Sequence, residues 1–279
     1  MPRVTVLTSV YNGEPYIDRA VPSILNQTYT DFEFLIVDDG STDGTAPFLE
    51  KVEKEDPRVR VIRNGRMGFS KALNYALAQA KGEYIIRQDF DDVSYPERIE
   101  KQVEFLDANP GVGLVGTWYV LEDHNRNEKY IRKWPTDHDS IRKTMSKAIP
   151  FAHTQVALRK EALVAAGGIA DVKNITDLRT WISVGKQGWK FANIPEVLGV
   201  HYVYKDSFWH QNFKYHRRQR ELAFVQCKAI LGLNLGAWRF IFPLARIFYS
   251  YMPFCFKKCL RRSLTKSREE DLPTAKIAN

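Results

Sequence analysis

Strand-like and helix-like patterns alternate five times within the first 118 residues, and this alternation constrains the fold more than any other feature of the sequence. The strand-like runs are short and rich in β-branched and aliphatic residues, whereas the helix-like runs repeat apolar residues every three or four positions. This order favours an α/β fold with a mostly parallel central sheet flanked by helices on both faces. Strands are expected at 3–9, 32–37, 59–63, 83–87 and 112–117, and helices at 16–26, around 49–52, at 69–80 and at 96–108.

Carboxylates gather at the predicted ends of two of these strands. Right-handed crossovers bring the carboxyl ends of parallel strands to one edge of the sheet, where ligands bind in α/β proteins. A divalent cation relieves the repulsion among crowded carboxylates and also accepts substrate phosphates as ligands. We therefore expect a site for a metal and a diphosphate, although a solvated turn before the helix at 96–108 is the alternative for the second group. The carboxylates are Asp38 and Asp39 after the second strand, and Asp89, Asp91 and Asp92 after the fourth.

Positive charge is concentrated in the last quarter of the chain. The whole chain has a formal net charge of +8, whereas residues 207–279 hold 14 Lys and Arg against 4 Asp and Glu, a net of +10. Within this tail, Arg239, Arg246 and Lys257 recur at helical spacings among many aromatic residues. This pattern predicts a basic amphipathic helix at a membrane interface, followed by a polybasic patch for anionic lipid. The patch consists of Lys257, Lys258, Arg261 and Arg262.

Other interpretations of the tail stay open. No uninterrupted apolar run reaches the roughly 18 to 20 residues that a membrane span needs. The aromatic residues could instead pack on the rest of the chain or on a second subunit, as in a homodimer. Nucleic-acid binding is disfavoured, because residues 1–206 hold 27 basic against 29 acidic side chains and carry no recognition motif.

Cysteine usage and the first residues predict where the protein works. Cys227, Cys255 and Cys259 lie late in the chain and show no metal-ligand spacing, which predicts a reducing compartment without a disulfide framework. The first residues run directly into a strand pattern, so no signal peptide is expected. Together with the basic tail, these features predict a cytoplasmic protein on the inner face of the cell membrane.

Four segments of the sequence resemble the family 2 glycosyltransferases, which have the GT-A fold, and in particular bacterial enzymes that make cell-surface polysaccharides. The resemblance spans roughly residues 3–206, and the order of the first three segments makes it specific. It implies a catalytic domain at 1–206, with a nucleotide-sugar-binding half at 1–118 and an acceptor-binding half at 119–206, before a helical, basic and aromatic extension at 207–279. The segments read VTVLTSVYNGEPYI, SILNQTYTDFEFLIVDDGSTDGT, AKGEYIIRQDFDDVSYPERIEKQ and GWKFANIPEVLG.

The resemblance implies a nucleotide-sugar site built from residues at the strand ends. Ser9, Tyr11 and Asp39 match the positions that hold the base and ribose, with the ring of Tyr11 as a face for uracil and Asp39 as an acceptor for the base. Lys71 is assigned to the same site. For Tyr11, a plain aromatic residue in a turn is the alternative.

The resemblance also implies a metal site for Mn²⁺ or Mg²⁺. Asp89 and Asp91 match the two acidic positions of the DxD motif. Asp89 is expected to contact the ribose and a metal-bound water, and Asp91 to bind the metal directly. Asp92 is expected to cap or orient the loop rather than to bind the metal.

Asp177 matches the catalytic base of the family, although Thr176 stands where the family usually has a glutamate. A structural role as a helix cap is the alternative for Asp177. A second departure lies at Tyr204, which replaces a histidine that completes the metal shell in many members. His201 and His210 lie nearby in sequence, but neither is assigned. Arg217 and Arg218 could reach the diphosphate.

The sequence therefore predicts an inverting, metal-dependent glycosyltransferase. A UDP-sugar is the expected donor, and a glycan or glycolipid hydroxyl is the expected acceptor. The alternative is a nucleotide-sugar-binding module of the same fold without transferase activity. A nucleotidyltransferase is set aside, because the segment after the first strand, at 11–14, is neither glycine-rich nor basic.

Overall fold

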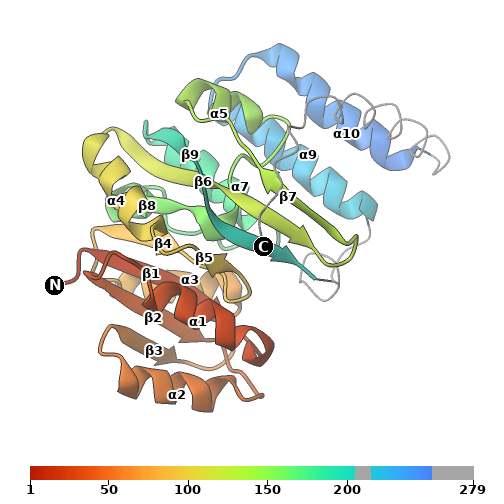
Figure 1. Ribbon diagram of the computed structural model, residues 1–279. Helices are drawn as coiled ribbons and strands as arrows, with labels where there is room; N and C mark the ends of the chain where they lie inside the picture. Colours follow the sequence, from red (N-terminus) through yellow and green to blue (C-terminus); the bar gives the residue numbers. More distant parts are fainter. Residues whose placement is uncertain (205–214, 253–279) are drawn as a thin grey trace.

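The computed structural model describes residues 1–204 and 215–252. Within this part of the chain a nine-stranded sheet forms the centre, and helices cover both of its faces (Figure 1). The first four strands begin and end within one residue of their predicted positions, and the strand predicted at 112–117 begins as predicted but extends to residue 123. The strands of the sheet are β1 Val4–Val10, β2 Phe32–Asp38, β3 Val59–Arg63, β4 Tyr84–Arg87, β5 Val93–Ser94, β6 Val112–Asp123, β7 Glu128–Arg132, β8 Ala157–Arg159 and β9 Lys190–Val203.

The sheet is parallel in its first half and mixed in its second. Its order is β3-β2-β1-β4-β8-β6-β9-β5, and β7 pairs with β6 at the side. The four strands β3, β2, β1 and β4 are parallel, as predicted. The short β8 then runs antiparallel to both β4 and β6, so the predicted strand at 112–117 does not pair with β4 directly. β9 is parallel to β6, and the two-residue β5 is antiparallel to β9.

Two apolar layers hold the helices to the sheet, because alternate strand residues face opposite sides. The residues Val4 and Val6 of β1 face the layer under α1, α2 and α4, whereas Leu7 faces the layer under α3, α6, α7 and α9. The helices are α1 Ile17–Leu25, α2 Thr45–Glu55, α3 Phe69–Gln79, α4 Arg98–Ala108, α5 His138–Thr144, α6 Lys160–Ala165, α7 Thr176–Lys186, α9 Tyr215–Gly232 and α10 Ile241–Tyr251. Short 3-10 turns are η1 Glu14–Tyr16, η2 His153–Gln155 and η3 Ala237–Phe240.

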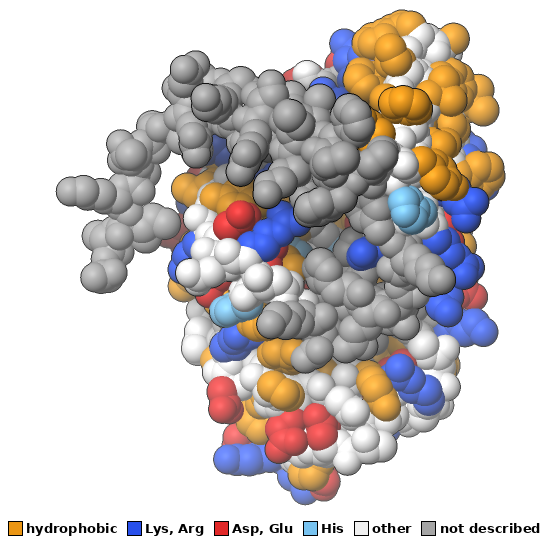
Figure 2. Space-filling view, turned by 90° about the vertical axis from the view of Figure 1, so that its right-hand side faces the viewer, with side chains coloured by type: hydrophobic (Ala, Val, Ile, Leu, Met, Phe, Trp, Pro, Cys, Tyr) orange, Lys and Arg blue, Asp and Glu red, His pale blue; other side chains and the backbone are white. Residues whose placement is uncertain are grey.

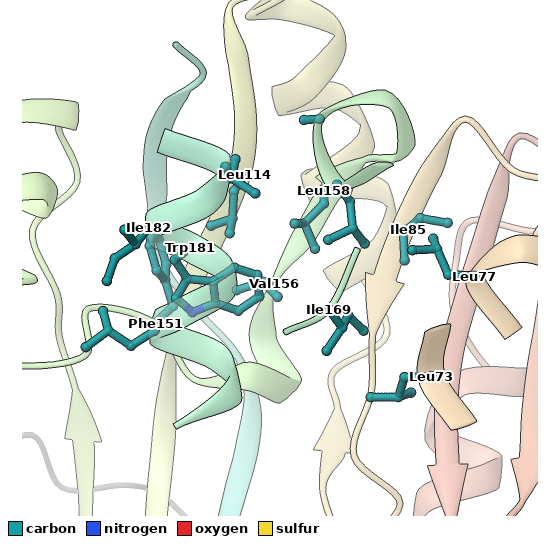
Figure 3. Packing of buried hydrophobic residues seen from close by; sticks show 14 of the residues in the cluster. Leu73, Leu77, Ile85, Leu114, Phe151, Val156, Leu158, Ile169, Trp181 and Ile182 are labelled. Atoms are coloured by element: carbon teal, nitrogen blue, oxygen red, sulfur yellow. The ribbon is translucent and has the colours of Figure 1, made fainter. Parts of the chain in front are cut away.

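Trp181 anchors α7 in the second of these layers. Its side chain is buried and lies beside Phe151 and Val156, between α7 and the sheet (Figure 3). An indole of this size removes a large apolar area from water, which fixes the helix against the strands. The first turn of α7 is therefore held in place, and with it Asp177, one turn before Trp181.

The described part of the tail, 215–252, is mostly helical, as predicted, and some of it belongs to the core. Val225, Ala229 and Leu233, from α9 and the turn after it, are buried in the same apolar cluster as α7. α10 follows η3 and packs along α9 (Figure 1). Across the described residues, no helix combines the length and the apolar character that crossing a bilayer would take.

Candidate active site

The carboxyl ends of β1, β2 and β4 meet at one edge of the sheet. In the register of these parallel strands, Val10 lies opposite Asp38 and Leu7 lies opposite Arg87. The loops that follow each strand therefore leave the sheet side by side. This edge carries five of the predicted site residues, which are Ser9, Tyr11, Asp39, Asp89 and Asp91.

A buried polar network holds the acidic loop at 88–92. Gln88 donates from Nε2 to two backbone oxygens of this loop, at 2.9 and 3.0 Å. Its Oε1 accepts from the Ser94 hydroxyl at 2.7 Å and from Arg98 Nη1 at 2.9 Å. All three side chains are buried, and buried polar groups that are fully paired make a rigid structure. The loop that presents the carboxylates is therefore fixed from beneath.

Asp89 is paired with a buried arginine. Arg87 Nη2 donates to Asp89 Oδ1, and the same nitrogen lies 3.2 Å from His153 Nδ1. The backbone N–H of Asp89 donates to the Thr154 hydroxyl at 3.1 Å. Burial raises the pKa of the carboxyl, but the charge of Arg87 and the contact with His153 outweigh it and hold the pKa of Asp89 well below its usual range. Asp89 is therefore a fixed anion at neutral pH.

His153 is a site residue that the sequence did not reveal. His153 Nδ1 lies 3.2 Å from Arg87 Nη2 and 3.7 Å from Asp89 Oδ1. Its other ring nitrogen, Nε2, is buried and has no hydrogen-bond partner among the described residues. In the sequence, 66 residues separate Arg87 from His153, and only the insertion of β8 beside β4 brings them together. No local sequence pattern predicts a contact between residues so far apart in the chain.

Asp91 is the carboxylate without a counter-charge. No side chain of the described residues donates to it or pairs with it, although its backbone oxygen accepts from Arg19 Nη2 at 2.9 Å. Burial and the neighbouring charges of Asp92 and Asp89 raise the pKa of Asp91 to about 8. A cation would remove this repulsion and return Asp91 to its ionised form.

Asp92 has a structural role, as predicted. It is fully buried, and its Oδ1 accepts from the backbone N–H of Tyr202 at 2.8 Å. Its Oδ2 lies 2.9 Å from His201 Nδ1. Burial lowers the pKa of His201, but Asp92 and the other two loop carboxylates outweigh it and raise the pKa to about 9. The carboxylate thus joins the acidic loop to β9 and fixes the orientation of the His201 ring.

The donor set at this edge suits Mn²⁺ or Mg²⁺. No group of three or more His, Cys, Asp or Glu side chains arranged for a metal occurs within residues 1–204 and 215–252. Mg²⁺ is commonly held by one or two carboxylates, with substrate phosphates and water as its other ligands. Asp91, which has no side-chain partner among the described residues, and Asp89 beside it could supply these one or two carboxylates. His201 lies next to the same loop through its contact with Asp92.

Tyr204, which stands where the resembled family often has a metal-binding histidine, packs against other aromatic rings. Its ring stacks on His124 with the centroids 4.7 Å apart and lies 5.5 Å from Tyr16. The guanidinium of Arg19 lies over the rings of Tyr204 at 5.4 Å and Tyr202 at 4.2 Å. Because Arg19 also donates to the backbone of Asp91, this aromatic group supports the acidic loop from the side.

Arg66 contacts two of the predicted base-binding residues, Tyr11 and Asp39. The guanidinium of Arg66 lies 3.4 Å from the ring centroid of Tyr11 and 3.4 Å from Asp39 Oδ2. Asp39 is buried and accepts from the backbone N–H groups of Met67 and Gly68. Tyr11 and Asp39 thus lie near each other through Arg66, while Asp39 also supports the loop at 66–68 and Arg66 lies against one face of the half-exposed Tyr11 ring.

Asp177 lies in the first turn of α7, where Ile175 before it adopts φ 55° and ψ 41°. This left-handed conformation is costly for a β-branched residue, and such strain is found most often at functional sites. Asp177 Oδ1 accepts from the backbone N–H of Leu178 at 2.7 Å. Burial and, to a smaller extent, Asp89 raise the pKa of Asp177 against the opposing effect of His153, so the three side chains share one electrostatic environment.

The remaining predicted residues are placed as follows. Lys71 is exposed in the first turn of α3. Arg217 lies in the first turn of α9, where its Nε is 3.4 Å from Glu221 Oε1, and Arg218 follows it. His210 and the polybasic patch at 257–262 lie outside the described residues, as do Cys255 and Cys259.

Comparison with known proteins places this geometry among glycosyltransferases. The sequence profile of glycosyl transferase family 2 matches residues 5–166. The chain is 31% identical over 255 residues to the putative glycosyltransferase EpsE of Bacillus subtilis, covering 88% of this chain and 90% of that protein. It is also 31% identical over 211 residues to the O-antigen biosynthesis glycosyltransferase WbnJ of Escherichia coli, covering 73% and 81%.

Solved structures agree in fold. The mannosyltransferase PcManGT from Pyrobaculum calidifontis, in complex with GDP-Man and Mn²⁺, superimposes with a TM-score of 0.65 at 24% identity, covering 95% of this chain and 80% of that one. TarS residues 1–349 from S. aureus, in complex with UDP-GlcNAc, gives a TM-score of 0.67 at 19% identity, covering 90% and 73%.

Proposed function

The chain belongs to glycosyl transferase family 2 and is a glycosyltransferase of the GT-A fold, and we propose that it is an inverting, metal-dependent member of this family. In this proposal it moves a sugar from a nucleotide sugar to an acceptor hydroxyl. The observation that carries the proposal is Asp91, a carboxylate that has no side-chain partner among the described residues and lies between two other carboxylates at the carboxyl edge of the sheet. Such a group needs a cation, and a cation at this edge suits a diphosphate.

Asp91 and Asp89 would hold Mn²⁺ or Mg²⁺, which when bound neutralises the charge that develops on the leaving diphosphate. Asp91 is the direct ligand in this scheme. Asp89, which Arg87 keeps ionised, contacts the ribose and a metal-bound water. The Mn²⁺ in the PcManGT complex supports the choice of metal for that protein and, by analogy, for this one.

Asp177 would act as the general base. It takes the proton of the acceptor hydroxyl while the acceptor oxygen forms a bond to the anomeric carbon of the donor sugar. The bond between that carbon and the diphosphate oxygen breaks, and the nucleoside diphosphate leaves with the electron pair. Attack opposite the leaving group inverts the configuration. Burial raises the pKa of Asp177, which makes its carboxylate a better proton acceptor than an exposed aspartate.

The donor is proposed to be a UDP-sugar and the acceptor a glycan or glycolipid. Tyr11 supplies an aromatic face at the nucleotide end of the site, and Ser9, Asp39 and Lys71 line the same region in this proposal. TarS is in complex with UDP-GlcNAc, and WbnJ is named for O-antigen biosynthesis, which supports both choices by analogy. In this proposal the enzyme works at the inner face of the cell membrane.

Release of nucleoside diphosphate from a panel of UDP-sugars and GDP-sugars, with Mn²⁺ or with a chelator, tests the proposal. We expect release with at least one donor, only in the presence of the metal, and loss of release in Asp91→Asn. Asp18→Asn, which alters an exposed aspartate in α1, is the matched control and should behave like the wild type. Donor binding without any release, in the presence of glycan acceptors, would favour a binding module of the same fold.

A further inference from the structure

The outer face of the last two helices is strongly apolar. Seven large hydrophobic side chains are each at least 57% exposed on this face. Figure 2 shows hydrophobic side chains gathered at the top of the molecule, with Lys and Arg side chains close beneath them. A folded chain that stays free in water seldom exposes so many large apolar groups together. The seven, which we call the α9–α10 face, are Phe224, Leu231, Trp238, Ile241, Leu244, Phe248 and Tyr251.

Arg246 of α10 and Arg239 of η3 hold this face outward. Arg246 donates to Gln226 Oε1 at 3.0 Å, to Gln219 Oε1 at 2.8 Å and to the backbone oxygen of Lys147 at 2.7 Å. Arg239 donates to the backbone oxygen of Lys143 at 3.3 Å. The two arginines that the sequence assigned to the basic stripe of an interfacial helix therefore lie against the protein, and the apolar side of α10 has one fixed direction.

The cations beside the apolar face come from α9 instead. Arg220 and Lys228 are exposed on the same side of α9 as Phe224, and the Lys228 Nζ lies 4.8 Å from the Phe224 ring centroid. Residues 215–252 contain six Lys and Arg but one acidic residue, Glu221. Glu221 is engaged, since it accepts from Asn174 Nδ2 and lies next to Arg217. No negative charge in this stretch therefore opposes an anionic surface.

A second copy of the chain and a lipid bilayer are the two main candidates for covering the α9–α10 face, and charge favours the bilayer. A symmetric dimer would bring two copies of the same positive surface together, which is unfavourable. A bilayer with anionic lipid accepts the apolar side chains among its headgroups and attracts the cations. With 11 residues, α10 is about 16 Å long, which suits a helix lying in the plane of the membrane surface.

We propose that the α9–α10 face docks on an anionic lipid bilayer, with α10 in the interface plane and Arg220 and Lys228 above it. This inference deepens the proposed place at the membrane and does not depend on the catalytic residues. Docking would hold the active site near acceptors that are themselves anchored in lipid.

Flotation of the full chain with vesicles tests this proposal. We expect the wild type to float with vesicles that contain phosphatidylglycerol, and less with phosphatidylcholine alone or at high salt. Ile241→Ser combined with Phe248→Ser should weaken binding at least tenfold, and Lys228→Glu should weaken it on anionic vesicles. Val164→Ser, which alters an exposed apolar residue of α6, is the matched control and should float like the wild type.

A wild-type chain that stays in the aqueous fraction with both kinds of vesicle would overturn the proposal. A dimer in light scattering that Ile241→Ser with Phe248→Ser converts to a monomer, without any change in flotation, would assign the face to a second copy instead. Nucleoside diphosphate release, measured without lipid, should be the same in the docking variants and the wild type. Failure of docking is therefore distinguishable from failure of the catalytic proposal.

Discussion

The Asp92 Oδ2 lies 2.9 Å from the Nδ1 of His201, across the antiparallel pair formed by β5 and β9. The same carboxylate accepts from the backbone of Tyr202, so both of its oxygens are used within the fold. Asp91, one residue earlier, has no such partner within residues 1–204 and 215–252. Two neighbouring aspartates therefore have opposite roles, one for stability and one for the ligand.

The first prediction follows from this difference. Asp92→Ala removes one partner of a buried ion pair and should lower the free energy of unfolding by about 3 kcal/mol. Asp91→Ala should leave it unchanged or raise it, because it removes repulsion instead. Denaturant titration of the two variants measures both values. Equal losses would contradict the assignment of separate roles.

The pH dependence of stability gives the second prediction. In the metal-free protein the pKa of Asp91 is about 8, raised from 3.8, so the native state binds more protons than the unfolded state between these pH values. The free energy of unfolding should therefore fall as the pH rises through this range. His201, with its pKa raised from 6.5 to about 9, acts in the same direction at the upper end.

Comparison with Asp91→Asn isolates the contribution of Asp91. At about pH 8 the variant should melt at a higher temperature than the wild type. The difference should be roughly 2 to 4 °C for each kcal/mol of unfolding free energy that the wild type loses when Asp91 ionises, and it should be smaller at about pH 5. Mn²⁺ should remove the difference, because it stabilises the wild type alone. If the melting temperatures of the wild type and Asp91→Asn differ by the same amount at both pH values, the result would contradict a raised pKa of Asp91.

The third prediction concerns the base. Asp177→Asn keeps the size of the side chain and removes its ability to take a proton, so turnover should fall by roughly 10² to 10⁴. UDP binding, measured by calorimetry, should not change. Thr176→Val, which alters the neighbouring side chain in the same turn, should retain most of the turnover. A variant Asp177→Asn that fails to fold would instead support a purely structural role in α7.

The fourth prediction concerns the loop over the nucleotide site. Arg66 lies on one face of the Tyr11 ring and pairs with Asp39, so a base that stacks on that face must first displace it. An exposed cation–π contact is worth about 0.5 to 1 kcal/mol, so Arg66→Ala should speed association of UDP by a few fold. Arg63→Ala, which breaks the exposed pair with Glu53, is the control. Slower association in Arg66→Ala would show that Arg66 recruits the nucleotide.

Much of the fold could be predicted from the sequence, because local patterns determine it. The strands β1 to β4 and the helices between them follow apolar periodicities that are visible within ten or twelve residues. The two-residue β5 could not be predicted in the same way, because it is too short to carry a periodic signal, and neither could the position of β8 between β4 and β6. Their pairing depends on contacts between distant parts of the chain, and so does the position of His153 beside Arg87.

The sequence pointed to the residues of the candidate site but not to the side chains that pair with them. Spacing and resemblance identified Asp89, Asp91 and Asp177, but not that Arg87 would neutralise the first and leave the second alone. Periodicity likewise placed Arg239 and Arg246 on one side of a helix without revealing which side packs on the protein. Only packing against α9 decides that the arginines face inward and the aromatic residues outward.

The account depends most on a cation held by Asp91 against the diphosphate. Calorimetric titration of UDP into the wild type and into Asp91→Asn, with Mn²⁺ and with a chelator, tests this claim directly. We expect Mn²⁺ to tighten UDP binding to the wild type at least tenfold and to have no effect on Asp91→Asn. Mn²⁺ that strengthens binding equally in both proteins would contradict the assignment of the metal to Asp91.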